Sequence, residues 1–157
     1  MARKKTWREK LSDSKDLPKV VLLKNNARKH WKSRTIAIPS SMEVNEVMAK
    51  VPKGKLITIE QICKIIARKL GADIGCPLTC GIFSWIAAHA AAEEAAEGKR
   101  RATPYWRTLK KGGEINPKYP GGIEDQKKHL ESEGHKVTQK GKKYVVENYE
   151  QYLIKVI

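Results

Sequence analysis

The sequence has no hydrophobic run long enough to cross a membrane. Its longest weakly polar stretch, residues 75–92, is rich in alanine and is interrupted by Thr79, Ser84 and His89. A membrane-spanning helix needs about 20 mostly apolar residues. The opening residues, Met-Ala-Arg-Lys-Lys, also lack the apolar core of a signal peptide. We therefore expect a protein that is neither secreted nor inserted in a membrane.

Cysteine is scarce and shows no disulfide pattern. The chain has three, Cys63, Cys76 and Cys80, an odd number that favours a reducing interior. We expect a cytoplasmic protein, associated with the nucleoid if the source is prokaryotic. Cys76 and Cys80, with Cys63 and His89, suggest a zinc site, but no second Cys/His pair follows at ligand spacing. We therefore expect no metal and no other cofactor.

Acidic residues are too few to balance the basic ones. Against 32 Lys and Arg stand 17 Asp and Glu, which leaves a formal net charge of +15. Residues 1–34 alone hold 12 Lys or Arg and three Asp or Glu. Such asymmetry favours a polyanionic partner over a merely solvated surface. Nucleic acid is favoured over an anionic membrane, because the basic stretch shows no clean amphipathic helix.

The patterns in the remaining chain predict a mainly α-helical fold with a small β hairpin. With 157 residues, there is room for one ordinary domain with its own core. A capping box at Thr58 and Gln61 marks a helix start, and Gly71 is suited to its end. We expect helices over residues 44–51, 59–70, 77–97, 123–133 and 149–156, an extended segment at 35–39, and strands at 135–139 and 143–147.

The helices on either side of residues 71–76 allow a helix-turn-helix, and the basic hairpin around residues 140–142 resembles a wing. We predict a winged-helix-like helix-turn-helix domain over residues 39–157. A basic N-terminal extension over residues 1–38 precedes it.

An irregular stretch over residues 103–122 gathers aromatic side chains, glycines and cations. Aromatic faces stack on bases, and nearby Lys and Arg neutralise phosphates. Loops of this kind are also where binding sites tend to lie. The stretch is therefore the first candidate for a nucleic-acid site.

Here the chain resembles the DNA-binding domain of the alkylguanine-DNA alkyltransferases, and more closely their alkyltransferase-like relatives. Residues 53–62 match the family's first helix, and Pro104-Tyr-Trp-Arg107 stands at its active-site motif. Tyr119-Pro-Gly-Gly122 matches a glycine-rich turn, and residues 130–134 match the end of the next helix. The matched order covers about residues 42–140.

The departures from the family are informative. The alkyl-accepting cysteine falls at Tyr105, and the histidine that activates it falls at Trp106. A phenol with a reference pKa near 10 is a poor nucleophile, and an indole N–H only donates. Suicide alkyl transfer should therefore be absent. The alkyltransferase-like relatives also replace this cysteine, and they bind damaged DNA without repairing it.

The resemblance also assigns site residues. A base pocket would be lined by Tyr105, Trp106 and Tyr119, with Arg107 and Glu133 holding the loop. The family inserts an arginine into the base stack, whereas here the corresponding stretch offers no arginine. The residues expected at the DNA are Thr79, Ile82 and Phe83 in the groove and Lys99, Arg100, Arg101, Lys110 and Lys111 at the phosphates.

We therefore expect a monomer that binds double-stranded DNA and recognises damaged or modified bases by nucleotide flipping, with excision-repair proteins as possible partners. One alternative is a glycosylase-type enzyme acting on a flipped base, with Glu133, Glu114 or Asp125 as its carboxylate. The other is a general nucleic-acid-binding module. His129 and His135 flank Glu133, and we expect both to be surface histidines.

Overall fold

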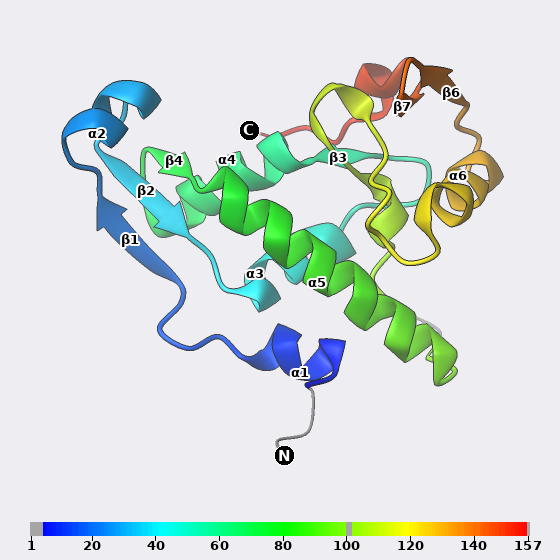
Figure 1. The fold of residues 1–157 in the computed structure, drawn as a ribbon, viewed down its shortest axis with the longest axis horizontal. Coiled ribbons are helices and arrows are strands. Elements are labelled where there is room, and N and C mark those ends of the chain that lie inside the picture. Colours follow the sequence, from blue (N-terminus) through cyan, green and yellow to red (C-terminus); the bar gives the residue numbers. More distant parts are fainter. Residues whose placement is uncertain (1–4, 100–101, 157) are drawn as a thin grey trace.

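A computed structural model describes residues 5–99 and 102–156 (Figure 1). Three helices form its centre: α3 (Ser41–Ala49), α4 (Ile59–Leu70) and α5 (Pro77–Ala96). The long α5 runs across the molecule and contacts both α3 and α4. Within the described ranges, none of the helices has the length and apolarity that a membrane span requires.

The ends of these helices follow local sequence signals. Ser40 accepts a hydrogen bond from the backbone of Glu43, whose carboxylate accepts one from Ser40 N–H in return. Thr58 and Gln61 form the same reciprocal capping box for α4, as the sequence predicts. Gly71 ends α4 with φ of 70°, in the left-handed region that favours glycine.

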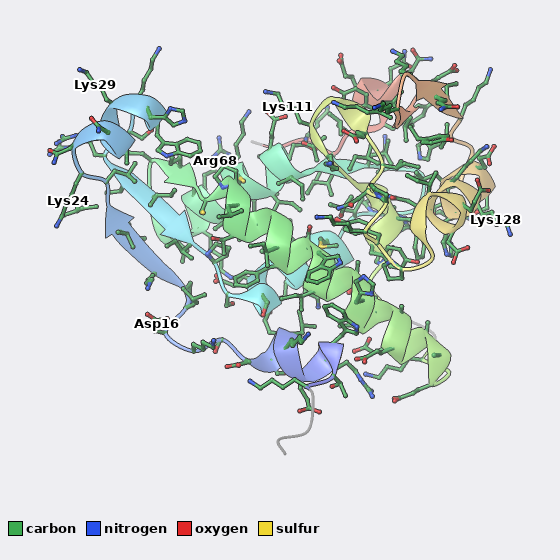
Figure 2. The ribbon with its side chains drawn as sticks, viewed as in Figure 1. Asp16, Lys24, Lys29, Arg68, Lys111 and Lys128 are labelled. Carbon is green, nitrogen blue, oxygen red and sulfur yellow. The ribbon has the colours of Figure 1, made fainter. Side chains whose placement is uncertain are left out.

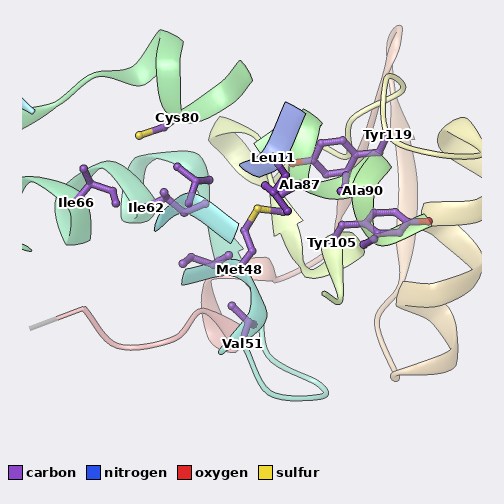
Figure 3. Packing of buried hydrophobic residues seen from close by; sticks show 14 of the residues in the cluster. Leu11, Met48, Val51, Ile62, Ile66, Cys80, Ala87, Ala90, Tyr105 and Tyr119 are labelled. Atoms are coloured by element: carbon purple, nitrogen blue, oxygen red, sulfur yellow. The ribbon is translucent and has the colours of Figure 1, made fainter. Parts of the chain in front are cut away.

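Apolar faces of the three helices meet in a continuous core. Met48, Val44, Ile62 and Ile66 are fully buried, because their helical spacing places each on its helix's inner face. Figure 3 shows Tyr105 and Tyr119 beside Ala87 and Ala90 of α5, toward one end of this cluster. The candidate site is thus built directly on the core.

The N-terminal segment packs on these helices. It contains α1 (Trp7–Ser12), β1 (Lys19–Leu22), α2 (Asn25–Trp31) and β2 (Thr35–Ile38). Helix α1 contacts α5 and places Leu11 in the core. Strand β2 pairs antiparallel with β1 and parallel with β4 (Ile74–Gly75), so the sheet order is β1-β2-β4. The division of the chain at residue 38 stays a prediction.

Strand β4 lies in the turn between α4 and α5, and it needs glycine at its second position. A Cβ on Gly75 would lie 2.3 Å from the carbonyl oxygen of Cys63 in α4. Gly75→Ala should therefore lower the free energy of unfolding by about 1–3 kcal/mol, measured by chemical denaturation. Gly81→Ala is the control within α5, where an added Cβ meets nothing within 4 Å. It should stabilise the protein by about 0.5–1 kcal/mol. Equal effects of the two changes would contradict the close approach.

The C-terminal half builds a second, smaller core. It contains the 3-10 turn η1 (Tyr105–Arg107), β5 (Thr108–Leu109), the turn η2 (Lys111–Gly113), α6 (Gly122–Ser132) and the hairpin β6 (Val137–Lys140) and β7 (Lys143–Val146). Strand β5 pairs parallel with β3 (Ile57–Thr58). Leu56, Leu109, Ile115 and Leu130 are fully buried in this cluster. The predicted hairpin and the helix before Gly134 are confirmed.

The helix expected over residues 149–156 is wrong. Only a short 3-10 turn, η3 (Tyr149–Tyr152), forms there. Leu153 then pairs with Leu56 in a parallel bridge, and the backbone of Leu56 bonds to Tyr152 and Ile154. The apolar residues of this segment are thus partly buried along an extended chain, and long-range pairing overrides their helical spacing.

Candidate nucleic-acid interface

The turn η1 carries the Tyr-Trp-Arg motif between α5 and α6, both of which it contacts. Thr103 Oγ1 donates to Asn45 Oδ1 of α3 at 2.7 Å, and Tyr105 N–H donates to the carbonyl of Thr103 at 2.8 Å. After the turn, the chain enters β5 beside β3. The motif is therefore fixed at both ends by distant parts of the chain.

Glu133 organises the motif. Its side chain is 5% exposed and accepts hydrogen bonds from Arg107 Nε and Nη2, Trp106 Nε1 and the backbone N–H of Gly54. Arg107 Nη1 donates in addition to the carbonyl of Val51 at 2.7 Å. Burial acts to raise the pKa of Glu133, but hydrogen bonds from Arg107, Trp106 and Gly54 outweigh it and hold that pKa below its ordinary value. Glu133 is thus an ionised anchor, and the structure brings it to the predicted partners.

Four aromatic rings cluster beside this anchor. Trp106 stacks on His129 of α6 at 4.0 Å between ring centroids, and Tyr105 meets Trp106 and Tyr119 edge to face at 5.4 and 5.9 Å. Tyr105 is 7% exposed and Tyr119 3% exposed. The predicted pocket residues are therefore together but closely packed, and a base would reach Tyr105 only after neighbouring side chains shift. Sequence reasoning missed the contribution of His129.

Both phenols of the cluster are held neutral. Burial raises the pKa of Tyr119 to about 12, although its hydrogen bond to Ser84 Oγ opposes the shift. Burial and the nearby Asp125 raise the pKa of Tyr105 as well. Neither oxygen is therefore a phenolate at neutral pH.

The loop that carries Tyr119 is fastened to α5 by residues that the sequence analysis did not assign to the site. The carbonyl of Lys118 accepts from Trp85 Nε1 at 3.0 Å and lies 2.9 Å from His89 Nε2. Trp7 of α1 stacks on His89 at 4.4 Å. Trp85 and His89 lie four residues apart on one helix, and this spacing in the sequence indicates that their side chains share one face. Helix α1 thus stabilises the position of His89, which contacts the loop.

The residues expected in a groove lie in the first turns of α5. Ile82 is 44% exposed, whereas Phe83 is half-buried and packs against the core. Thr79 donates its hydroxyl hydrogen to Cys76 Sγ at 3.0 Å. Ile82 is therefore the most exposed of the three expected groove residues, and Leu78, one turn earlier, is 72% exposed.

The expected phosphate-binding cations are dispersed. Lys99 follows the far end of α5, about 30 Å from Pro77 at 1.5 Å per residue, and forms an ion pair with Glu94. Lys110 pairs with Glu114, and Lys111 is exposed on η2. Arg100 and Arg101 lie outside the described residues. Lys99 is thus separated from the first turns of α5.

The expectation that His135 lies on the surface is wrong. It is 6% exposed, packs edge to face on Tyr152, and neither ring nitrogen has a hydrogen-bond partner among the described residues. Burial lowers the pKa of His135 below its ordinary 6.5, although the negative charge of Glu133 opposes the shift.

This burial predicts a pH dependence of stability. Because the unfolded chain protonates His135 more readily, the free energy of unfolding should fall as pH drops below about 6.5 and through the folded-state pKa. The contribution is fully present above pH 6.5, where the ring is neutral in both states. The test compares denaturation curves of the wild-type protein and of His135→Phe between pH 8 and 5. The free energy of unfolding should decline less in the variant as the pH falls. Parallel profiles would contradict it.

Over residues 5–99 and 102–156, no three His, Cys, Asp or Glu side chains gather where a metal ion could bind. Cys63 and Cys80 are buried in the main core, and Cys76 is half-buried at the start of α5.

The helix pair α4–α5 joined by the turn at β4, followed by the hairpin β6–β7, defines a helix-turn-helix domain of the alkyltransferase-like fold. Among the solved structures that share this fold are two complexes with DNA. One is S. pombe Atl1 in complex with damaged DNA containing O6-carboxymethylguanine, with a TM-score of 0.53 and 22% identity, covering 74% of this chain and 94% of that chain. The other is S. pombe ATL in complex with DNA, with a TM-score of 0.52, 23% identity and the same coverage. No family model and no curated protein matches the sequence.

Proposed function

We propose that this protein binds duplex DNA at damaged or modified bases, holds the flipped nucleotide beside Tyr105, and transfers no alkyl group. One observation carries the proposal: Glu133 anchors both Trp106 and Arg107, so that the motif at the family's active-site position is rigidly built around a tyrosine. The shared fold with proteins solved on DNA supports the choice of partner.

The chemistry of the motif argues against alkyl transfer. Tyr105 is a protonated phenol whose pKa is raised by burial. The neighbouring Trp106 uses its only N–H to bond Glu133 and has no lone pair to accept a proton. The motif positions Tyr105 and Trp106 therefore offer an aromatic surface for a nucleobase, in place of the thiol nucleophile and the histidine that activates it in the alkyltransferases.

The position of α5 suggests how DNA would lie. In helix-turn-helix proteins, the first turns of the second helix enter a groove. Here those turns expose Ile82, an apolar side chain of the kind that wedges between base steps. Tyr119 is bonded to Ser84 on the same helix, which connects the groove-facing turns to the aromatic cluster.

Two of the three carboxylates named for the glycosylase alternative, Glu133 and Glu114, are already engaged. Glu133 has both oxygens occupied by Arg107 and Trp106, and its lowered pKa makes it a poor proton donor. Glu114 directly follows η2 and forms ion pairs with Lys110 and Lys143. The third, Asp125, lies close enough to Tyr105 to raise its pKa, and it is the residue to replace if base release is observed. We further propose that the protein acts as a monomer in the cytoplasm and passes the lesion to excision-repair proteins.

The proposal is tested by binding to three duplexes at fixed salt: one with an alkylated guanine, one with a deaminated purine and one unmodified. We expect tighter binding to a modified duplex and no strand cleavage or base release. Equal affinity for all three would reduce the protein to a general nucleic-acid-binding module. Released base would instead make it an enzyme.

A further inference from the structure

We propose that the segment from β1 to β2 is a second DNA-binding surface, which contacts the phosphate backbone to one side of the damaged base. This inference rests on the proposed function and extends it to part of the chain that precedes the matched order of motifs. The segment comprises residues 19–38 and is called here the β1–α2–β2 unit.

Charge is the first observation. Residues 19–34 contain six Lys or Arg and no Asp or Glu. Lys19 pairs with Asp16, but the side chains of Lys24, Arg28, Lys29 and Lys32 make no ion pair or hydrogen bond with other described residues. Unpaired cations grouped at one end of the molecule favour a polyanion (Figure 2).

Placement is the second observation. Asp73, in the turn of the helix-turn-helix, accepts from the backbone N–H groups of Arg34 and Thr35 at 2.8 and 3.1 Å, and its own N–H donates to Thr35 Oγ1. Cys76 N–H, at the start of α5, donates to the carbonyl of Ala37. The unit is therefore fixed beside the end of α5 that would enter the groove.

An exposed aromatic ring lies among these cations. Trp31 is 40% exposed beside Lys32, and on nucleic-acid-binding surfaces an aromatic ring stacks on a base while a neighbouring cation neutralises a phosphate. Strand β1 is the exposed edge of the sheet. The four residues of β1 form a strand about 13 Å long, at about 3.3 Å per residue. That length corresponds to about four base pairs of flanking DNA, at 3.4 Å per pair.

The test measures affinity for an alkylated-guanine duplex whose flank is shortened on one side of the lesion, then on the other. Wild-type protein should lose affinity when one particular flank is trimmed by about four base pairs. Arg28→Gln with Lys29→Gln should bind the long duplex about tenfold more weakly, with a salt slope flatter by about two. It should lose no further affinity when that flank is trimmed.

Lys127→Gln with Lys128→Gln is the matched control, because it removes two adjacent cations from α6 at the opposite end of the molecule (Figure 2). It should retain the flank dependence. Equal losses in both double variants, or wild-type affinity in the α2 variant, would overturn the inference. A difference in oligomeric state between the α2 variant and the wild-type protein would also overturn it. So would a substitution that changed binding of polyglutamate in place of binding of DNA. Flank dependence without lesion preference would leave this surface intact and refute only the proposed function.

Discussion

Replacing Glu133 with alanine should lower the free energy of unfolding by about 3–5 kcal/mol. The change leaves the Arg107 guanidinium, the Trp106 indole N–H and the Gly54 N–H without their shared acceptor. Their desolvation is then uncompensated, because the Arg107 side chain is only 13% exposed. Domains are stable by about 5–15 kcal/mol in total, so the loss should be plain in chemical denaturation.

Glu131→Ala is the control for this change. Glu131 is an exposed carboxylate two residues earlier in α6, and it makes no side-chain bond with other described residues. Its removal should alter stability by no more than about 0.5 kcal/mol. Similar effects of the two substitutions would show that Glu133 does not anchor the motif.

The second large effect concerns discrimination between damaged and normal DNA. Tyr105→Leu removes the ring while filling most of its volume, and the preference for the damaged duplex should fall by about 1–3 kcal/mol. That is about five- to 150-fold in the ratio of dissociation constants. The measurement is competitive binding of damaged and unmodified duplexes at one salt concentration.

Two further variants show whether the effect belongs to the ring. Tyr105→Phe keeps the ring and loses only a long contact of 3.5 Å to the carbonyl of Pro120, so it should keep the preference. Lys111→Gln should weaken binding to both duplexes alike and flatten the salt dependence of the binding constant by about one. If Tyr105→Leu weakened binding to both duplexes equally, Tyr105 would not face the base.

Local signals predicted the helices α3 to α6 and the hairpin β6–β7 well, but not α1 or α2. The capping boxes at Ser40 and Thr58 act within four residues, and the period of the apolar positions in α4 matches its buried face. The hairpin at Gly141 likewise depends on neighbours in sequence. Such elements are determined by interactions between residues that are close together in the sequence.

Features that join distant segments were not predictable in the same way. The pairing of Ile36 with Ile74 involves strands of a few residues, which carry too little pattern to be recognised. The same holds for the bridge between Leu56 and Leu153, which replaced an expected helix. At the site, the family resemblance identified Arg107 and Glu133, whereas the stacking of His129 on Trp106 depended on how α6 meets η1.

The central claim is recognition of a damaged base without chemistry on it. The most direct test incubates the protein with a duplex that carries one alkylated guanine, isolates the complex, and determines the masses of the protein and of both strands. The account predicts that the damaged duplex is bound in preference to its unmodified counterpart and that all masses are unchanged. A protein heavier by one alkyl group, or a strand that has lost its base, would contradict it.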